Sequence, residues 1–201
     1  MSRRMHSLEG FDPPGLSKEH PVEMTRLCLY DIAIAHPRDW NVYINPQKLM
    51  DYTHGALKLE KLEKRPTDIS TSIKWMPLTG FDPDKYIESL RGALKKKFKH
   101  KLHGFDHRGV EHCGHEAFLT LYHYADNHSI YKVLRKDEEV VEMQLMLPCE
   151  TSGRIVIANV ASIAADMETQ AALFESLLMR LECHPQERLH GKDLVGVERA
   201  A

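Results

Sequence analysis

Ile69-Ser70-Thr71-Ser72-Ile73-Lys74-Trp75 is the clearest structural signal in this sequence. Its β-branched and apolar residues alternate with polar ones, which is the period-2 pattern of a strand with one buried face. Just before it, Leu57 and Leu59 fall among lysines and glutamates in a similar way. Residues 27–44 predict a strand, a turn at residues 36–39 and a second short strand. The first half of the chain is therefore expected to form a sheet.

The second half of the chain also predicts strands, now apolar on both faces. They are expected at residues 117–124, 130–134, 140–147 and 154–163, with polar turns at 135–138 and 150–153. Neighbouring apolar pairs such as Phe118 with Leu119 require cover on both faces of a sheet. We expect the core to contain Ile73, Trp75, Leu119, Leu121, Leu145, Ile155 and Ile157.

Two helices are expected. Asp82 and Pro83 are typical of a helix start, since aspartate caps free amides and proline suits the first position. Apolar residues then recur at helical spacing as far as Phe98, and a similar stripe predicts a closing helix over residues 167–182. A loop is expected from the first helix to His112. The order predicts an α+β fold, with a mostly antiparallel sheet and helices packed on both faces, a three-layer α/β/α sandwich.

Length and composition favour one domain. The chain has 201 residues, with 42% hydrophobic and 28% charged, so we expect a domain over residues 26–185, an irregular leader over 1–25 and a polar tail over 186–201. The net charge of −2 predicts no general attraction to nucleic acid or anionic membranes. No apolar run follows Arg3 and Arg4 as an export signal requires, and none reaches the roughly 20 residues of a membrane span. We expect a cytoplasmic protein with four reduced cysteines.

The order of these elements resembles the PsbP-like fold, which includes the Ran-binding Mog proteins and the bacterial DcrB family. The similarity lies in the strand and turn ending in Pro-Arg-Asp-Trp at residues 37–40, the helix from Asp82, and the Gly-His-Glu-Ala at 114–117 that begins a strand. The later hairpins and closing helix complete it over residues 27–184. The resemblance implies a binding or assembly protein. Many members are exported, and no family site residue can be carried over.

Cysteine and histidine residues fall at expected strand and helix ends. Cys113 and His115 are two residues apart and would share a face at the start of a strand, while Cys149 ends another strand and Cys183-His184 follows the closing helix. Thiolate and imidazole donors in a tetrahedral arrangement suit zinc. Against this, the sequence has no Cys-x-x-Cys pair, and isolated cysteines are commonly buried apolar residues. A Cys149–Cys183 disulfide is a third interpretation, and no other cofactor is predicted.

A basic run follows the first helix and forms the other candidate site. It contains Lys95, Lys96, Lys97, Lys99, Lys101 and Arg108. Such a run can bind an anionic partner such as RNA. The alternative, which we favour, is that cations gather where they offset the dipole at the carboxyl end of a helix.

Three functions remain open. The first is a non-enzymatic binding or adaptor domain for a protein partner or for a second copy of itself. The second is a metal-dependent or hydrolase-like enzyme using the cysteine and histidine residues above. The third and weakest is a nucleic-acid accessory protein. No nucleophile elbow, P-loop or dinucleotide-binding glycine pattern occurs, and Arg154 is expected to pair with a carboxylate.

Overall fold

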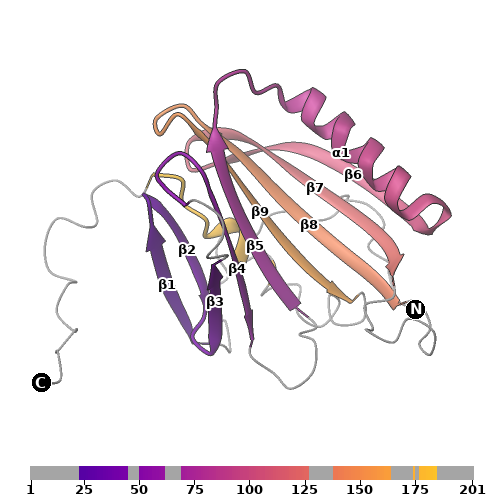
Figure 1. Ribbon diagram of the computed structural model, residues 1–201, viewed down its shortest axis with the longest axis horizontal. Coiled ribbons are helices and arrows are strands. Elements are labelled where there is room, and N and C mark those ends of the chain that lie inside the picture. Colours follow the sequence, from indigo (N-terminus) through magenta and orange to yellow (C-terminus); the bar gives the residue numbers. More distant parts are fainter. Residues whose placement is uncertain are drawn as a thin grey trace, which may run out of the picture.

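A seven-stranded antiparallel sheet forms the body of the computed structural model, with the strand order β3-β4-β5-β9-β8-β7-β6 (Figure 1). The structure describes residues 23–44, 50–61, 69–126, 138–163, 174 and 177–184. The strands of this sheet are β3 (Trp40–Ile44), β4 (Gly55–Lys61), β5 (Ile69–Pro77), β6 (Leu102–His112), β7 (His115–Asp126), β8 (Glu138–Cys149) and β9 (Arg154–Ile163). A separate hairpin contains β1 (Met24–Leu29) and β2 (Ile32–Pro37). The α+β class and the mostly antiparallel sheet are therefore confirmed.

Strand β5 lies inside the sheet, between β4 and β9, as its alternation predicts. Ile73 and Trp75 are each 1% exposed, and the indole Nε1 of Trp75 donates to the Asp51 carbonyl at 2.8 Å. The other five residues expected in the core are also at most 5% exposed. The period-2 and doubly apolar patterns thus identified the buried residues correctly.

Helix α1 (Pro83–Phe98) covers one face of β7, β8 and β9 (Figure 1). It begins as expected, because the Asp82 carboxylate accepts from the Lys85 amide at 3.1 Å. On the opposite face, the large core cluster contains side chains of β1 and β2 together with Phe174, Leu177, Leu178 and Leu181. Most of the closing helix expected at 167–182 lies outside the described residues, and only Phe174 and residues 177–179 have helical backbone there.

Two expectations for the local structure are wrong. Residues 24–44 form three strands, because a turn at Tyr30 and Asp31 precedes the expected one; both residues have positive φ, 49° and 56°, where glycine and asparagine are the usual signal. The expected loop before His112 is strand β6, an edge strand rich in histidine and charge that β7 pairs along its length. Charged residues are common on such edges.

Several other expectations lie outside the described residues. These are the strand at 130–134, the turn at residues 135–137, most of the leader and all of the tail. The first described strand, β1, begins at Met24, two residues before the expected start of the domain, and the domain bounds stay a prediction. No helix in the described part of the chain is both long and apolar enough to cross a membrane.

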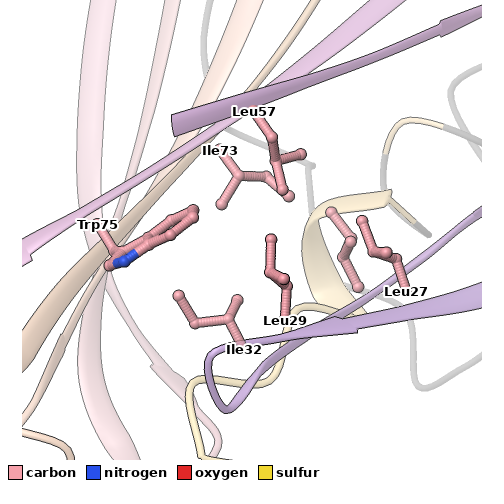
Figure 2. Close-up of a pocket in the computed structure, with 7 residues that line it drawn as sticks. Leu27, Leu29, Ile32, Leu57, Ile73 and Trp75 are labelled. Carbon is pink, nitrogen blue, oxygen red and sulfur yellow. The ribbon is translucent and has the colours of Figure 1, made fainter. Parts of the chain in front are cut away.

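A small cavity lies between the β1–β2 hairpin and strands β4 and β5 (Figure 2). Its walls are seven apolar side chains: Leu27, Leu29, Ile32, Ile34, Leu57, Ile73 and Trp75. The volume of about 10 Å³ is roughly what one water molecule needs. The cavity is therefore too small for a metabolite and too apolar to direct any chemistry.

Candidate metal centre

The candidate cluster begins where β7 starts and β8 ends. The turn between β6 and β7 consists of Cys113 and Gly114, which have φ of 54° and 74°, and it delivers His115 to the start of β7. Strands β7 and β8 are antiparallel, with Phe118 opposite Met146. Continuing that register brings His115 opposite Cys149, which is the last residue of β8.

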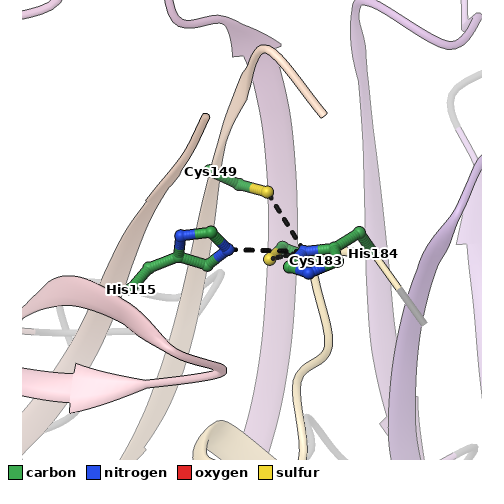
Figure 3. Close-up of side chains that lie close together, drawn as sticks. All are labelled: His115, Cys149, Cys183 and His184. Carbon is green, nitrogen blue, oxygen red and sulfur yellow. Dashed lines mark hydrogen bonds between the residues drawn. The ribbon is translucent and has the colours of Figure 1, made fainter. Parts of the chain in front are cut away.

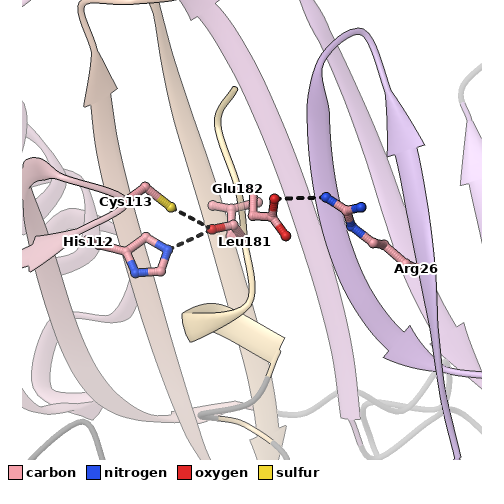
Figure 4. Close-up of polar contacts among 5 residues, drawn as sticks. All are labelled: Arg26, His112, Cys113, Leu181 and Glu182. Carbon is pink, nitrogen blue, oxygen red and sulfur yellow. Dashed lines mark hydrogen bonds and ion pairs between the residues drawn. The ribbon is translucent and has the colours of Figure 1, made fainter. Parts of the chain in front are cut away.

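Residues 181–184, which we call the C-terminal strap, bring the other two members. On one side the strap forms an isolated bridge with β2: the Ala33 amide donates to the Glu182 carbonyl at 2.9 Å, and the Glu182 amide donates to the Ala33 carbonyl at 2.7 Å. Arg26 of β1 forms an ion pair with the Glu182 carboxylate at 2.8 Å (Figure 4). The strap is therefore fixed to the hairpin by backbone and side chain.

The other side of the strap faces the turn between β6 and β7. The Leu181 carbonyl lies 2.7 Å from Nε2 of His112 and 3.2 Å from Sγ of Cys113 (Figure 4). Cys113 was expected on the same strand face as His115. It lies instead in the turn, where positive φ breaks the strand alternation, so it contacts the strap backbone and does not join the group formed by the other four candidates.

His115, Cys149, Cys183 and His184 converge on one point (Figure 3). The Nδ1 atom of His184 lies 2.9 Å from Sγ of Cys183, 3.2 Å from Sγ of Cys149 and 3.4 Å from Nε2 of His115. All four donor atoms lie within 4.8 Å of one another. Both cysteines are fully buried and both histidines are half-buried.

Hydrogen bonds alone do not account for this convergence. An imidazole nitrogen offers either one proton or one lone pair, so Nδ1 of His184 can form one good hydrogen bond with its three neighbours. A cation between the four atoms would accept a lone pair from each of them. The donor atoms around tetrahedral zinc are roughly 3.3–3.8 Å apart, and here Nδ1 of His184 lies 2.9–3.4 Å from its three neighbours, with all four donor atoms within 4.8 Å.

Arg154 organises the backbone beside this cluster. It is 1% exposed and was expected to pair with a carboxylate. Its guanidinium instead donates to the carbonyls of Tyr30, Tyr52 and Cys183 at 2.6, 2.8 and 3.4 Å and lies 4.0 Å from the centre of the Tyr52 ring. Because these carbonyls come from three distant loops, their convergence left no local signal in the sequence.

The thiols of Cys113 and Cys183 influence each other. The hydrogen bond with Cys183, followed by the neighbouring His112, lowers the pKa of the Cys113 thiol, whereas the bond with Cys113 and burial raise the pKa of Cys183. Cys183 therefore keeps its proton in the metal-free protein. A metal ion binds the thiolate and must displace that proton, so metal affinity falls as the pH falls.

The basic residues do not form one patch. Lys95, Lys96 and Lys97 are in the last turn of α1, and Lys99 and Lys101 are in the 3₁₀ turn that follows (Lys99–Lys101). Arg108 is opposite Leu119 in the sheet, and Leu119 belongs to the core cluster of the face opposite α1. Arg108 is thus separated from the lysines by the sheet.

No family model matches the sequence, and no curated protein matches it. Three solved structures show what the fold is similar to. The cyanobacterial PsbP (CyanoP) of Synechocystis sp. PCC 6803 is 10% identical with a TM-score of 0.57, over 83% of this chain and 98% of that one. LpqN of Mycobacterium tuberculosis, involved in cell envelope biogenesis, is 15% identical with a TM-score of 0.48, covering 81% and 91%.

The third structure is the Saccharomyces cerevisiae Ran-binding protein Mog1p, which is 11% identical with a TM-score of 0.48, over 81% of this chain and 96% of that one. The similarity to CyanoP confirms the resemblance to the PsbP-like fold that the order of elements indicated. At these levels of identity, the similarity concerns the fold alone.

Proposed function

We propose that this chain is a non-enzymatic binding domain in which a structural zinc ion fastens the C-terminal strap to the sheet. The observation that carries this proposal is the convergence of four nitrogen and sulfur donors, from His115, Cys149, Cys183 and His184, within 4.8 Å. These donors come from β7, β8 and the strap, so one ion would cross-link segments that are far apart in the sequence. We call this group the closed cluster.

The number of protein donors favours a structural ion over a catalytic one. A catalytic zinc keeps a coordination position open for water or substrate, whereas a structural zinc has four protein ligands. The closed cluster supplies four, two of them fully buried cysteines. A metal-dependent hydrolase would also need space for a substrate beside the ion. The closed donor set therefore supports the binding domain over the enzyme.

A partner surface is best supported at strand β3, which is one of the two edge strands of the seven-stranded sheet. Val42, Tyr43 and Ile44 follow one another there and are 37%, 38% and 48% exposed. Apolar residues on an edge strand favour pairing with an added strand. A protein partner that adds a strand to β3 is the occupant that we propose.

Metal analysis of the purified full-length chain tests the zinc ion. After dialysis against zinc in reducing buffer, elemental analysis should find zinc bound to the wild-type protein. The Cys183→Ser variant should contain one equivalent of zinc less than the wild type. Cys28→Ser is the matched control, since Cys28 is an exposed cysteine of β1. Equal zinc content in Cys183→Ser and the wild type would refute the proposed site.

The partner surface is tested by sedimentation and by binding. Tyr43→Lys places a charge on β3 and should abolish capture of a partner by the immobilised protein, whereas Lys74→Glu on the interior strand β5 should not. If the wild type instead forms a dimer that Tyr43→Lys dissociates, the occupant of β3 is a second copy. Unchanged partner binding in Tyr43→Lys would contradict the assignment of this surface.

The proposal also includes the arrangement of layers in the domain and its cellular compartment. The apolar side chains of Phe174, Leu177 and Leu178 support a second helical layer opposite α1, which would make the domain a three-layer sandwich. Four free cysteines and a zinc–thiolate site are suited to a reducing compartment such as the cytoplasm.

A further inference from the structure

A second group of potential metal ligands lies at the other end of strands β7 and β8. His123 is near the end of β7 and Glu139 is near the start of β8, and His103 of β6 approaches them from the neighbouring strand. The Oε2 atom of Glu139 lies 2.7 Å from Nε2 of His123 and 3.0 Å from Nδ1 of His103. The two imidazole rings meet edge to face, with centroids 5.4 Å apart.

An irregularity in β6 brings His103 to this position. Leu102 is opposite Tyr124 and Gly104 is opposite His123, so His103 is the extra residue of a β-bulge. A bulge redirects a side chain relative to the regular pleat of a strand. Without the bulge, neighbouring residues of β6 would alternate between the two faces. The extra residue thus allows a third side chain to join the pair from β7 and β8.

The burial of the three side chains indicates a site that opens to solvent. The side chain of His123 is 12% exposed, whereas those of His103 and Glu139 are 38% and 46% exposed. One ligand is therefore anchored in the sheet, and the other two lie at its surface. Three protein donors on one side leave room for water on the other, which is the arrangement of an exchangeable metal site.

The donor set indicates the class of metal. Two imidazole nitrogens and one carboxylate oxygen suit zinc and its neighbours among the divalent transition metals, whereas calcium and magnesium prefer oxygen alone. An ion pair without metal is the competing explanation. An exposed ion pair, however, stabilises a folded protein only weakly, which gives little reason for three side chains to converge.

We propose that His103, His123 and Glu139 form a second, solvent-facing site for a divalent transition metal such as zinc, whose remaining coordination position takes water. We call this group the open cluster. The proposal does not rest on the closed cluster, because the two groups share no residue and no thiol belongs to the open one.

Cobalt(II) is the probe that distinguishes the two clusters. Only a site with thiolate ligands gives a sulfur-to-cobalt charge-transfer band, so titration of the metal-free full-length chain in reducing buffer should show two binding events. One event should raise the charge-transfer band, and the other should change the visible cobalt bands without raising it. We call the event without the charge-transfer band the second event, and it reports cobalt binding at the open cluster. His103→Ala should lower the cobalt affinity of this second event by about 100-fold or more, since even outer-shell changes reduce metal affinity 10- to 100-fold.

Matched variants make the result unambiguous. His107→Ala removes another exposed histidine of β6 and should retain both events, whereas Glu139→Gln should lose the second event while keeping the fold. Cys183→Ser should lose the charge-transfer band and keep the second event. The open cluster is refuted if the wild type binds cobalt only with the charge-transfer band, or if His103→Ala retains both events. The first of these results would leave the closed cluster intact.

Discussion

The two ends of strands β7 and β8 carry contrasting ligand sets. At one end, His115 of β7 and Cys149 of β8 meet two residues of the C-terminal strap; at the other, His123 of β7 and Glu139 of β8 meet one residue of β6. The two histidines of β7 are eight residues apart, about 26 Å along a strand. An even spacing also places them on the same face of the sheet.

The two ends of β7 and β8 differ in the segment that supplies the remaining ligands. The strap adds a buried thiol and an imidazole, so the closed cluster has four donors and is tied to the hairpin through Glu182. The bulge in β6 adds a single exposed imidazole, so the open cluster has three donors. Metal at the closed cluster should therefore stabilise the fold, and metal at the open cluster should exchange with little effect on stability.

Metal removal should produce the largest effect. Zinc present at 1,000 times its dissociation constant stabilises a folded protein by about 4 kcal/mol, which corresponds to roughly 10 °C in Tm for a chain of this size. Chelation should lower the Tm by that amount and make the bond after Arg180 sensitive to trypsin, because the strap then loses its cross-link. Chelation should lower the Tm of the His103→Ala variant by the same amount as that of the wild type. A much smaller drop in the variant would show that metal at the open cluster supplies the stability.

An Arg154→Met variant should have a smaller, selective effect. It removes the donors to the Tyr30, Tyr52 and Cys183 carbonyls, which should cost about 1–3 kcal/mol and reduce zinc affinity at the closed cluster 10- to 100-fold. Denaturant melts and zinc competition titrations measure both quantities. Arg91→Met, on α1, is the control. Equal loss of affinity at both clusters would mean that Arg154 acts on the whole fold and not on the strap.

The smallest effect on stability is expected for Glu139→Gln. Exposed ion pairs contribute less than about 1 kcal/mol, so the free energy of unfolding should change by no more than that, although metal binding at the open cluster is lost. Urea melts of this variant and of Glu111→Gln, an exposed glutamate of β6, should nearly superimpose. A loss of several kcal/mol would contradict the view that the open cluster is peripheral to the fold.

The sequence predicted features that depend on local patterns. The alternation of residues 69–75 identified β5, and Asp82 with Pro83 identified the start of α1. Cys149, Cys183 and His184 could be selected because they fall at the ends of elements. By contrast, the turn at Tyr30 and Asp31 lacks the glycine that usually marks positive φ, and the ladder of β6 is formed with β7, so neither had a sufficient local signal.

The open cluster depends on contacts that no local pattern predicts. His103 and Glu139 are 36 residues apart, and they meet only through the register of β6, β7 and β8 and the bulge at Leu102 and Gly104. The roles of Arg154 and His112 likewise depend on where the strap docks. These features require long-range pairing, which the sequence alone leaves undetermined.

X-ray absorption of the zinc-loaded protein tests the closed cluster most directly. With one equivalent of zinc bound to the His103→Ala variant, the coordination shell should contain two sulfur atoms at about 2.3 Å and two nitrogen atoms at about 2.0–2.1 Å. A shell of nitrogen and oxygen without sulfur would contradict the proposal that Cys149 and Cys183 hold the ion together with His115 and His184.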